Sequence, residues 1–186
     1  MSTSDNPRQS MDRDSIIAHI PRLRRYARLL TGDAHRADDL VQDTLERAMV
    51  KWGLWQPGAD VDMRTLQLRA WLFTVMHNLF VNQLRGKAQA AARDAVSMDE
   101  VDVAGPGRDP GLRLDMERAL RQLPPDQLEV LLLVGLEDFS YAEAAILIGV
   151  PIGTVMSRLS RARKRLAELM EGAPVRTARP QLKVMK

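Results

Sequence analysis

Apolar residues recur at helical spacing along most of the chain, and Gly and Pro residues interrupt the pattern. Between Phe139 and Leu169 this pattern predicts two helices joined by a tight turn. Ser140 and Glu143 form a capping box that starts the first helix, and Gly149 suits the left-handed position that ends it. Pro151 suits the first turn of the second helix. An apolar stripe then runs through Val155, Leu159, Ala162 and Leu166.

The outward face of this second predicted helix carries hydroxyl and cationic side chains: Thr154, Ser157, Arg158, Arg161, Lys164 and Arg165. Hydroxyl groups at the N-terminal end with arginines behind them suit a helix that enters a DNA major groove. Ala145 and Gly149 are small enough for two tightly crossed helices. The stretch therefore predicts a DNA-binding helix-turn-helix, although an ordinary helical hairpin with a solvated basic face would carry the same charges.

The N-terminal part begins with a polar segment, residues 1–13, that is expected to be disordered. A helix is expected from about Asp14 to Leu30. Pro21 should kink or restart it because proline lacks the N–H that a helix interior needs, and Gly32 should end it. Its inward side is predicted to hold Ile16, Ile17, Ile20, Leu23, Ala27 and Leu30.

A second helix is expected from Asp33 or Ala34 to Trp52. Its outer face is acidic and polar at helical spacing. Such a face repels DNA, so it is either merely solvated or docks on a basic protein surface. The residues of this face are Asp38, Asp39, Gln42, Asp43 and Glu46.

A loop over residues 53–65 is expected to precede a helix from Leu66 to Arg85. This helix is apolar on nearly all sides, which indicates burial against several neighbours. Asn78, Asn82 and Arg85 suit hydrogen bonding to unstacked bases better than they suit a core.

The rest of the chain predicts a flexible acidic linker, two helices under the helix-turn-helix, and a basic tail. The two helices are expected over Leu112–Leu123 and from Pro125 to about Glu137. The predicted fold is therefore all-α, with two small helical domains joined by a flexible linker. The predicted segments are a first domain at 14–88, the linker at 89–111, a second domain at 112–171 and the tail at 172–186.

Composition narrows the function. The chain has no cysteine and three histidines without ligand spacing, so no disulfide, metal site or cofactor is expected. No apolar run is long enough to span a membrane and no signal peptide is visible, which predicts a cytoplasmic protein. No nucleophile–base constellation is visible either, so we do not expect an enzyme.

The net charge of +3 hides an uneven distribution. Residues 1–90 carry +3, residues 91–111 carry −3 and residues 112–186 carry +3. Two mildly basic blocks on a tether fit a polyanion contacted at two places. Because each phosphate contact needs its own cation, so small a charge predicts that a larger partner assists DNA binding.

Four blocks in order now resemble a known family. They are ADDLVQDTLERAM, LRAWLFTVMHNLFVNQLR, a variable linker, and LRQLPPDQLEVLLLVGLEDFSYAEAAILIGVPIGTVMSRLSRARKRL. Over residues 15–171 they resemble bacterial RNA polymerase sigma factors, in particular the extracytoplasmic-function (ECF) group of the sigma-70 family. Four blocks at the proper spacing make the resemblance far more specific than the helix-turn-helix alone.

The resemblance implies a role for each block. The first domain is similar to sigma region 2, whose acidic face (Asp38, Asp39, Gln42, Asp43, Glu46) would dock on the β′ clamp helices of the polymerase core. Asn78, Asn82 and Arg85 would meet bases of the −10 element. Trp71 and Phe73 lie in the strand-opening segment, where at least one of them is expected to be core. The second domain is similar to region 4, which would engage the β flap and contact the −35 element through Thr154, Ser157, Arg158, Arg161 and Lys164.

Some positions depart from the family pattern. Met156 stands where Lys is common, His77 replaces a frequent Arg, and the basic run after Arg85 is thin. The leading hypothesis is a sigma factor that directs promoter recognition and is held by an anti-sigma factor. Two alternatives remain, namely a sigma mimic that sequesters an anti-sigma factor and a helix-turn-helix regulator that binds operators alone.

Overall fold

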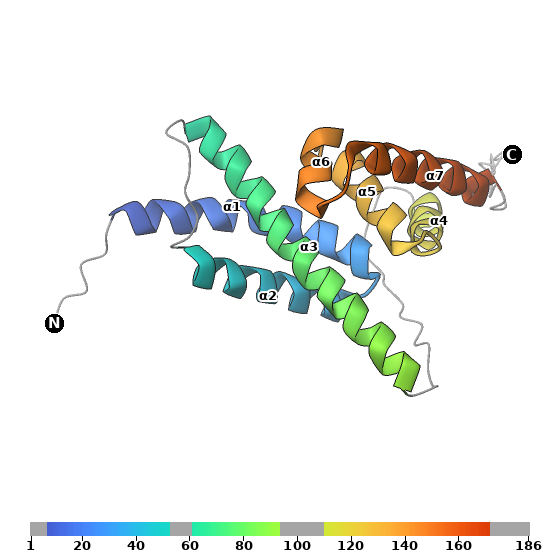
Figure 1. Cartoon of the computed structure of the whole chain (residues 1–186), viewed down its shortest axis with the longest axis horizontal. Coiled ribbons are helices and arrows are strands. Elements are labelled where there is room, and N and C mark those ends of the chain that lie inside the picture. Colours follow the sequence, from blue (N-terminus) through green and yellow to red (C-terminus); the bar gives the residue numbers. More distant parts are fainter. Residues whose placement is uncertain (1–6, 53–60, 94–109, 172–186) are drawn as a thin grey trace, which may run out of the picture.

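The computed structural model describes residues 7–52, 61–93 and 110–171, and every regular element in those ranges is a helix. The all-α prediction is confirmed. The predicted tail at 172–186 lies outside the described residues. The helices are α1 (Pro7–Thr31), α2 (Ala34–Lys51), α3 (Val61–Arg93), α4 (Pro110–Arg121), α5 (Pro125–Gly135), α6 (Tyr141–Ile148) and α7 (Ile152–Glu171) (Figure 1).

The N-terminal half is a bundle of three helices, in which α3 crosses both α1 and α2 (Figure 1). Gly32 turns the chain between α1 and α2 with a φ of +68°, a conformation that favours glycine. Asp33 then caps α2, because its carboxylate accepts a hydrogen bond from the backbone N–H of Arg36 at 2.7 Å. The shared core includes Leu23, Tyr26, Leu40, Leu72 and Met76.

Helix α1 differs from its prediction in two ways. It begins at Pro7, inside the segment 1–13 that was expected to be disordered, and Pro21 lies within it without ending it. Proline removes one hydrogen bond of the ladder, and packing on α2 and α3 holds the remaining turns in place. The predicted inward stripe also shifts, because Ile17 is 58% exposed whereas Tyr26 is buried.

Helix α3 is longer than predicted at both ends. It starts at Val61, within the predicted loop, and runs for 33 residues to Arg93, into the predicted linker. The alanine-rich segment 88–92 explains the C-terminal extension, since alanine has the highest helix propensity and the isolated Gly86 costs only about 1 kcal/mol. The rest of the predicted loop and linker lies outside the described residues.

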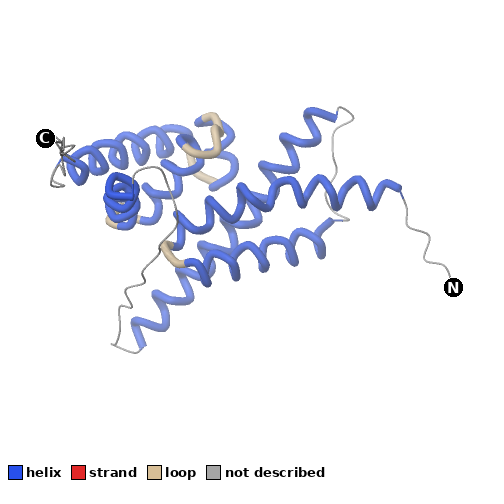
Figure 2. Tube along the Cα trace, turned by 180° about the vertical axis from the view of Figure 1, so that it is seen from behind, coloured by secondary structure: helices blue, strands red, loops and turns tan. Residues whose placement is uncertain are grey.

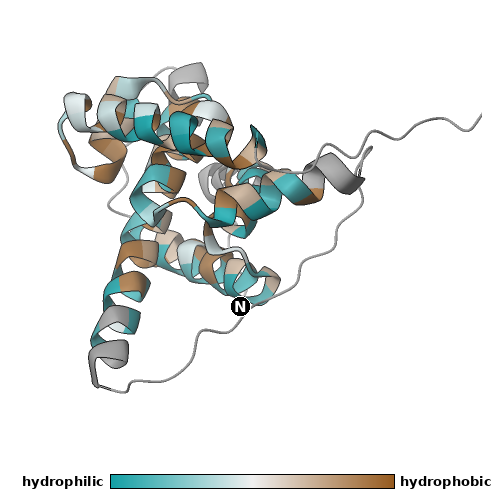
Figure 3. Ribbon diagram, turned by 90° about the vertical axis from the view of Figure 1, so that its right-hand side faces the viewer, coloured by the Kyte–Doolittle hydropathy of each residue, from teal (hydrophilic) through white to brown (hydrophobic). Residues whose placement is uncertain are grey.

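The C-terminal half forms the predicted helix-turn-helix on a base of α4 and α5. The capping box of Ser140 and Glu143 is present in both directions, and Gly149 ends α6 with a φ of +68°. Helices α6 and α7 meet at 105°, within the range of helix-turn-helix units. Val155, Leu159 and Ala162 of α7 are buried as predicted. In Figure 3 the helices at this end carry hydrophilic and hydrophobic bands, as expected for amphipathic helices.

In the described part of the chain, no single helix is long and apolar enough to cross a membrane. The bent pair α6 and α7 passes that test only by length and composition. These two helices are the helix-turn-helix itself.

The two halves pack directly against each other. Helix α3 contacts α6, and α1 contacts both α4 and α5. Viewed from behind, the α4–α7 group rests on one end of the α1–α3 bundle (Figure 2). The sequence predicted a tether between two domains but not this contact, and the contact brings the helix expected to read −10 DNA against the helix-turn-helix.

Candidate nucleic-acid and polymerase surfaces

The outward face of α7 is open. Arg161 and Lys164 are exposed, and Thr154 and Ser157 are half-buried at the N-terminal end of the helix. The Ser157 hydroxyl donates a hydrogen bond to the Thr154 carbonyl at 3.0 Å, which orients it locally and leaves its lone pairs available as acceptors. The arrangement matches the predicted recognition surface.

Arg158 is in a different situation from the other cations of α7. Its Nε lies 3.1 Å from Oδ2 of Asp126, which belongs to the first turn of α5, and its side chain is 26% exposed. This ion pair ties the recognition helix to the base of its own half. Arg158 is therefore partly committed to the fold, a contact that residue type and spacing alone did not reveal.

Three of the residues predicted to meet the −10 element lie together on α3. Asn78, Asn82 and Arg85 are all exposed, and their spacing of four and three residues places them on one side of the helix. Trp71 is half-buried and makes an edge-to-face contact with Trp52, with ring centroids 6.0 Å apart. The stripe of two amides and one guanidinium offers donors and acceptors suited to base edges.

Phe73 is not on this surface, which corrects its assignment as a −10 contact. Its side chain is 1% exposed, and its ring packs between Tyr26 at 5.0 Å and Phe139 at 5.4 Å, both edge to face. Because α3 is apolar on nearly all sides, hydropathy could not tell which aromatic residue is covered. The expectation that at least one of the pair Trp71 and Phe73 is core is confirmed by Phe73.

The acidic face of α2 is exposed along its length. Asp38 pairs with Arg24 of α1 at 3.1 Å, and Gln42 donates a hydrogen bond to Glu46 at 2.9 Å. The two remaining carboxylates therefore present their charge to solvent most directly. All five predicted residues lie on the exposed side of the helix: Asp38, Asp39, Gln42, Asp43 and Glu46.

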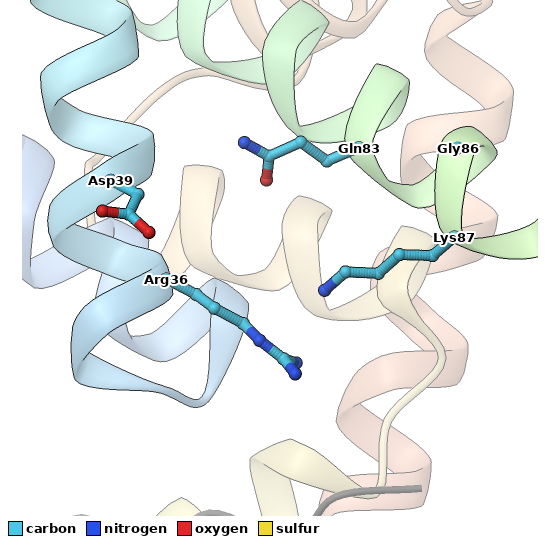
Figure 4. Close-up of a pocket in the computed structure, with 5 residues that line it drawn as sticks. All are labelled: Arg36, Asp39, Gln83, Gly86 and Lys87. Carbon is cyan, nitrogen blue, oxygen red and sulfur yellow. The ribbon is translucent and has the colours of Figure 1, made fainter. Parts of the chain in front are cut away.

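A pocket of about 490 Å³ lies where the start of α2 faces the end of α3. Arg36 and Lys87 extend toward the same space from the two helices, with Asp39 and Gln83 beside them (Figure 4). Cations and an anion line it together, so it does not have the uniform positive charge of a phosphate site. It joins the acidic face of α2 to the end of the predicted −10 helix.

A buried carboxylate lies at the junction of the two halves. The Glu137 side chain is fully buried, and its Oε1 accepts a hydrogen bond from Arg25 of α1 at 3.2 Å. Its Oε2 lies 3.6 Å from Nε of Arg22, which is an ion-pair distance rather than a hydrogen bond. Burial raises the pKa of Glu137, and the neighbouring arginines oppose that shift.

Arg69 of α3 completes this junction. It donates a hydrogen bond to the Glu137 carbonyl at 3.1 Å, and its guanidinium lies 4.2 Å from the centroid of the Phe139 ring, a cation–π distance. The segment between α5 and α6 is thus held by α1 and α3 of the other half.

His77 supplies a second polar contact between the halves. Its Nδ1 lies 2.6 Å from Oε1 of Glu129 in α5. Sequence reasoning did not single out Glu129, but a signal existed, because an acid between Leu128 and Val130 in an apolar run must find a partner if it is buried.

Comparisons with known proteins place both halves. Residues 16–77 match the family described as the sigma2 domain of PhyR, and residues 113–166 match the family described as sigma-70, region 4. The chain is 42% identical over 159 residues to the ECF RNA polymerase sigma factor EcfG of Rhodopseudomonas palustris, covering 85% of this chain and 84% of that protein. It is 30% identical over 158 residues to SigE of Mycolicibacterium smegmatis, covering 82% of this chain and 58% of that protein.

Solved structures agree with the sequence comparison. The sigma factor RpoE of Bartonella quintana, solved in complex with the anti-sigma factor NepR, superposes with a TM-score of 0.74 at 34% identity and covers 87% of this chain and 97% of that chain. CnrH, solved in complex with the cytosolic domain of CnrY, gives a TM-score of 0.62 at 25% identity, covering 91% and 92%.

The fold and its two separate reading surfaces define the class of protein as an RNA polymerase sigma factor. A sigma factor binds the polymerase core and directs it to promoter DNA, which agrees with the modest charge of this chain. The chain belongs to the ECF group of the sigma-70 family.

Proposed function

We propose that this sigma factor binds core polymerase through the acidic face of α2 and reads its promoter through α3 and α7. Asp39 and Asp43 would meet the basic β′ clamp helices, and the α3 stripe of Asn78, Asn82 and Arg85 would capture −10 bases. The face of α7 would enter the −35 major groove. The observation that carries the proposal is the 42% identity with EcfG over a region that includes all three surfaces.

The packing between the halves makes the described arrangement a closed form. The −10 and −35 elements are about 25 base pairs apart, which corresponds to roughly 85 Å at 3.4 Å per base pair. Helices α3 and α6 are in contact here, so the two readers cannot reach both elements at once. We infer that the halves separate when the chain joins the polymerase, and that the interface of Glu137, Glu129 and Phe139 opens in that step.

The proposed regulator is an anti-sigma factor of the NepR class. The support is RpoE of Bartonella quintana, which was solved with NepR and which this chain covers over 97% of its length. The chain would act in the cytoplasm and without catalytic chemistry of its own.

The second candidate function is a mimic that sequesters an anti-sigma factor. One observation favours it, because the family matched by residues 16–77 describes the sigma2 domain of PhyR, and PhyR was solved as an anti-anti-sigma factor with NepR. An open recognition face on α7 favours the sigma factor, since a mimic has no need of base-reading side chains.

Reconstituted transcription separates the two. Purified chain is added to sigma-free bacterial core polymerase on fragmented genomic DNA from the source organism, and transcript starts are mapped. Discrete starts that share two upstream elements at one spacing support the proposal. No starts and no core binding, together with tight binding to an anti-sigma factor, would support the mimic.

A further inference from the structure

Helix α7 exposes two large aliphatic side chains on its first turns. Ile152 is 49% exposed and Met156 is 52% exposed, and a spacing of four residues places them side by side on the helix surface. Both lie at the N-terminal end of α7, the end that a recognition helix inserts most deeply into the groove.

These two side chains do not serve the fold. Val155, Leu159 and Ala162 supply the buried face of α7. Neither Ile152 nor Met156 belongs to the buried core or to the partly buried residues packed against it. Isolated exposed aliphatic residues are common on proteins, but a neighbouring pair on the reading end of a recognition helix calls for a partner that is itself apolar in part.

The major groove offers one such partner. Among the four bases, only thymine presents an apolar group on its major-groove edge, the C5-methyl group. The hydroxyls of Thr154 and Ser157 and the cations Arg161 and Lys164 occupy the same helix, so polar base contacts and phosphate contacts surround the aliphatic pair. Two side chains are far too few for a protein partner, since a stable protein interface buries about 800 Å² on each side.

We propose that Ile152 and Met156 are specificity-determining residues that contact thymine methyl groups of the −35 element. The inference rests on the proposed function and adds the class of base that this end of α7 selects. Met156 would thus exchange a phosphate contact, the role of a cation at this position, for an apolar base contact. Affinity at this point should depend on a methyl group and not on salt.

Deoxyuridine tests the contact directly, because it differs from thymidine only by that methyl group. Duplexes of a promoter found by start mapping are made with each −35 thymine, on either strand, replaced singly by deoxyuridine. Binding of the reconstituted holoenzyme is then measured. Wild type should lose about three- to four-fold in affinity at one or two positions, the size expected for one buried methyl group.

Variants connect the effect to the side chains. Met156→Ala and Ile152→Ala should each bind the unmodified duplex more weakly and lose the deoxyuridine effect at their own position. Met156→Lys should retain binding, lose the methyl effect and steepen the dependence of log affinity on log salt by about one unit. Ile146→Ala is the matched control, because Ile146 is 82% exposed but lies on α6.

Several results would overturn the proposal. They are a −35 element with no thymine on either strand, wild-type binding indifferent to every deoxyuridine, or variants as sensitive as wild type. If start mapping gives discrete promoters, these results count against the methyl contact alone. If no promoter is bound specifically, the proposed function and this inference fall together.

Discussion

Nδ1 of His77 and Oε1 of Glu129 lie 2.6 Å apart, and the two residues belong to opposite halves of the molecule. Both side chains are largely buried, so the contact is shielded from water and stronger than a surface pair. Removing one partner leaves the other without its hydrogen bond in a covered position. The pair therefore contributes to the closed form without contributing to the core of either half.

Substituting Glu129→Gln should shift the chain toward the open form. Loss of a hydrogen bond to a charged group costs about 1.5–3 kcal/mol, which lowers the ratio of closed to open molecules roughly 10- to 100-fold. The chain has no cysteine, so dyes attached through Val50→Cys and Glu168→Cys would report the separation of the halves by energy transfer. Transfer should fall in Glu129→Gln and stay unchanged in the control Glu171→Gln. Equal transfer in all three proteins would contradict the role of the pair.

The fold was predictable where local chemistry decides it. Ser140, Glu143 and Gly149 define α6 through capping and a left-handed turn, and the structure has each of them in place. The apolar stripe of α7 was predictable for the same reason, because its period is that of a helix. Only the ends of α1 and α3 were misplaced, where helix extension costs little in either direction.

The arrangement of the halves was not predictable from the sequence. Glu137 and Phe139 lie between two predicted helices and look like loop residues, yet both are buried by α1 and α3. Contacts between residues more than 60 positions apart leave no periodic signature. The same reason explains Phe73, whose partner Phe139 belongs to the other half.

His19 makes stability depend on pH. It is buried beside Arg22 and Arg69, and burial first and these charges second lower its pKa below the ordinary value of about 6.5. The unfolded chain therefore binds a proton at higher pH than the folded chain does, so this contribution to stability is lost as pH falls below 6.5. Urea unfolding at pH 7.5 and 5.5 should show a larger loss for wild type than for His19→Gln.

The difference between the two proteins isolates His19. Burial raises the pKa of Glu137, so Glu137 contributes with the opposite sign, its stabilisation being lost as pH rises through that raised pKa. Glu137 is present in both proteins and cancels in the comparison. The same pH dependence in wild type and His19→Gln would refute the assignment.

The capping box should be needed for −35 binding although it does not contact DNA. The Ser140 hydroxyl accepts a hydrogen bond from the Glu143 N–H at 3.2 Å, and Glu143 accepts one from the Ser140 N–H at 2.8 Å. Ser140→Ala should cost about 1 kcal/mol of stability and weaken −35 binding by loosening α6 beneath α7. Ser160→Ala on the exposed side of α7 should be neutral or slightly stabilising, since alanine favours helix. Equal unfolding midpoints for the two variants would argue against the cap.

The acidic face of α2 should determine binding to core polymerase. Asp39 and Asp43 are exposed, so replacing both with lysine reverses the charge that a basic docking surface would meet, at little cost to the fold. The double variant should bind sigma-free core at least ten-fold more weakly, with the loss reduced at high salt. Glu171→Lys, at the exposed end of α7, serves as the charge control. Undiminished core binding by Asp39→Lys, Asp43→Lys would place the docking surface elsewhere.

Arg158 and Arg161 should respond differently to alanine substitution although both lie on the predicted DNA face. Arg161 is exposed, so Arg161→Ala should weaken −35 binding, flatten its salt dependence by about one phosphate contact and leave stability unchanged. Arg158 is held by Asp126 at 3.1 Å, so Arg158→Ala should also lower stability, by up to about 1 kcal/mol because the pair is partly exposed. Asp126→Asn releases Arg158 without removing it. If the ion pair only positions the helix, Asp126→Asn should lose DNA affinity together with stability, whereas a gain in affinity would show that Asp126 competes with DNA for the guanidinium.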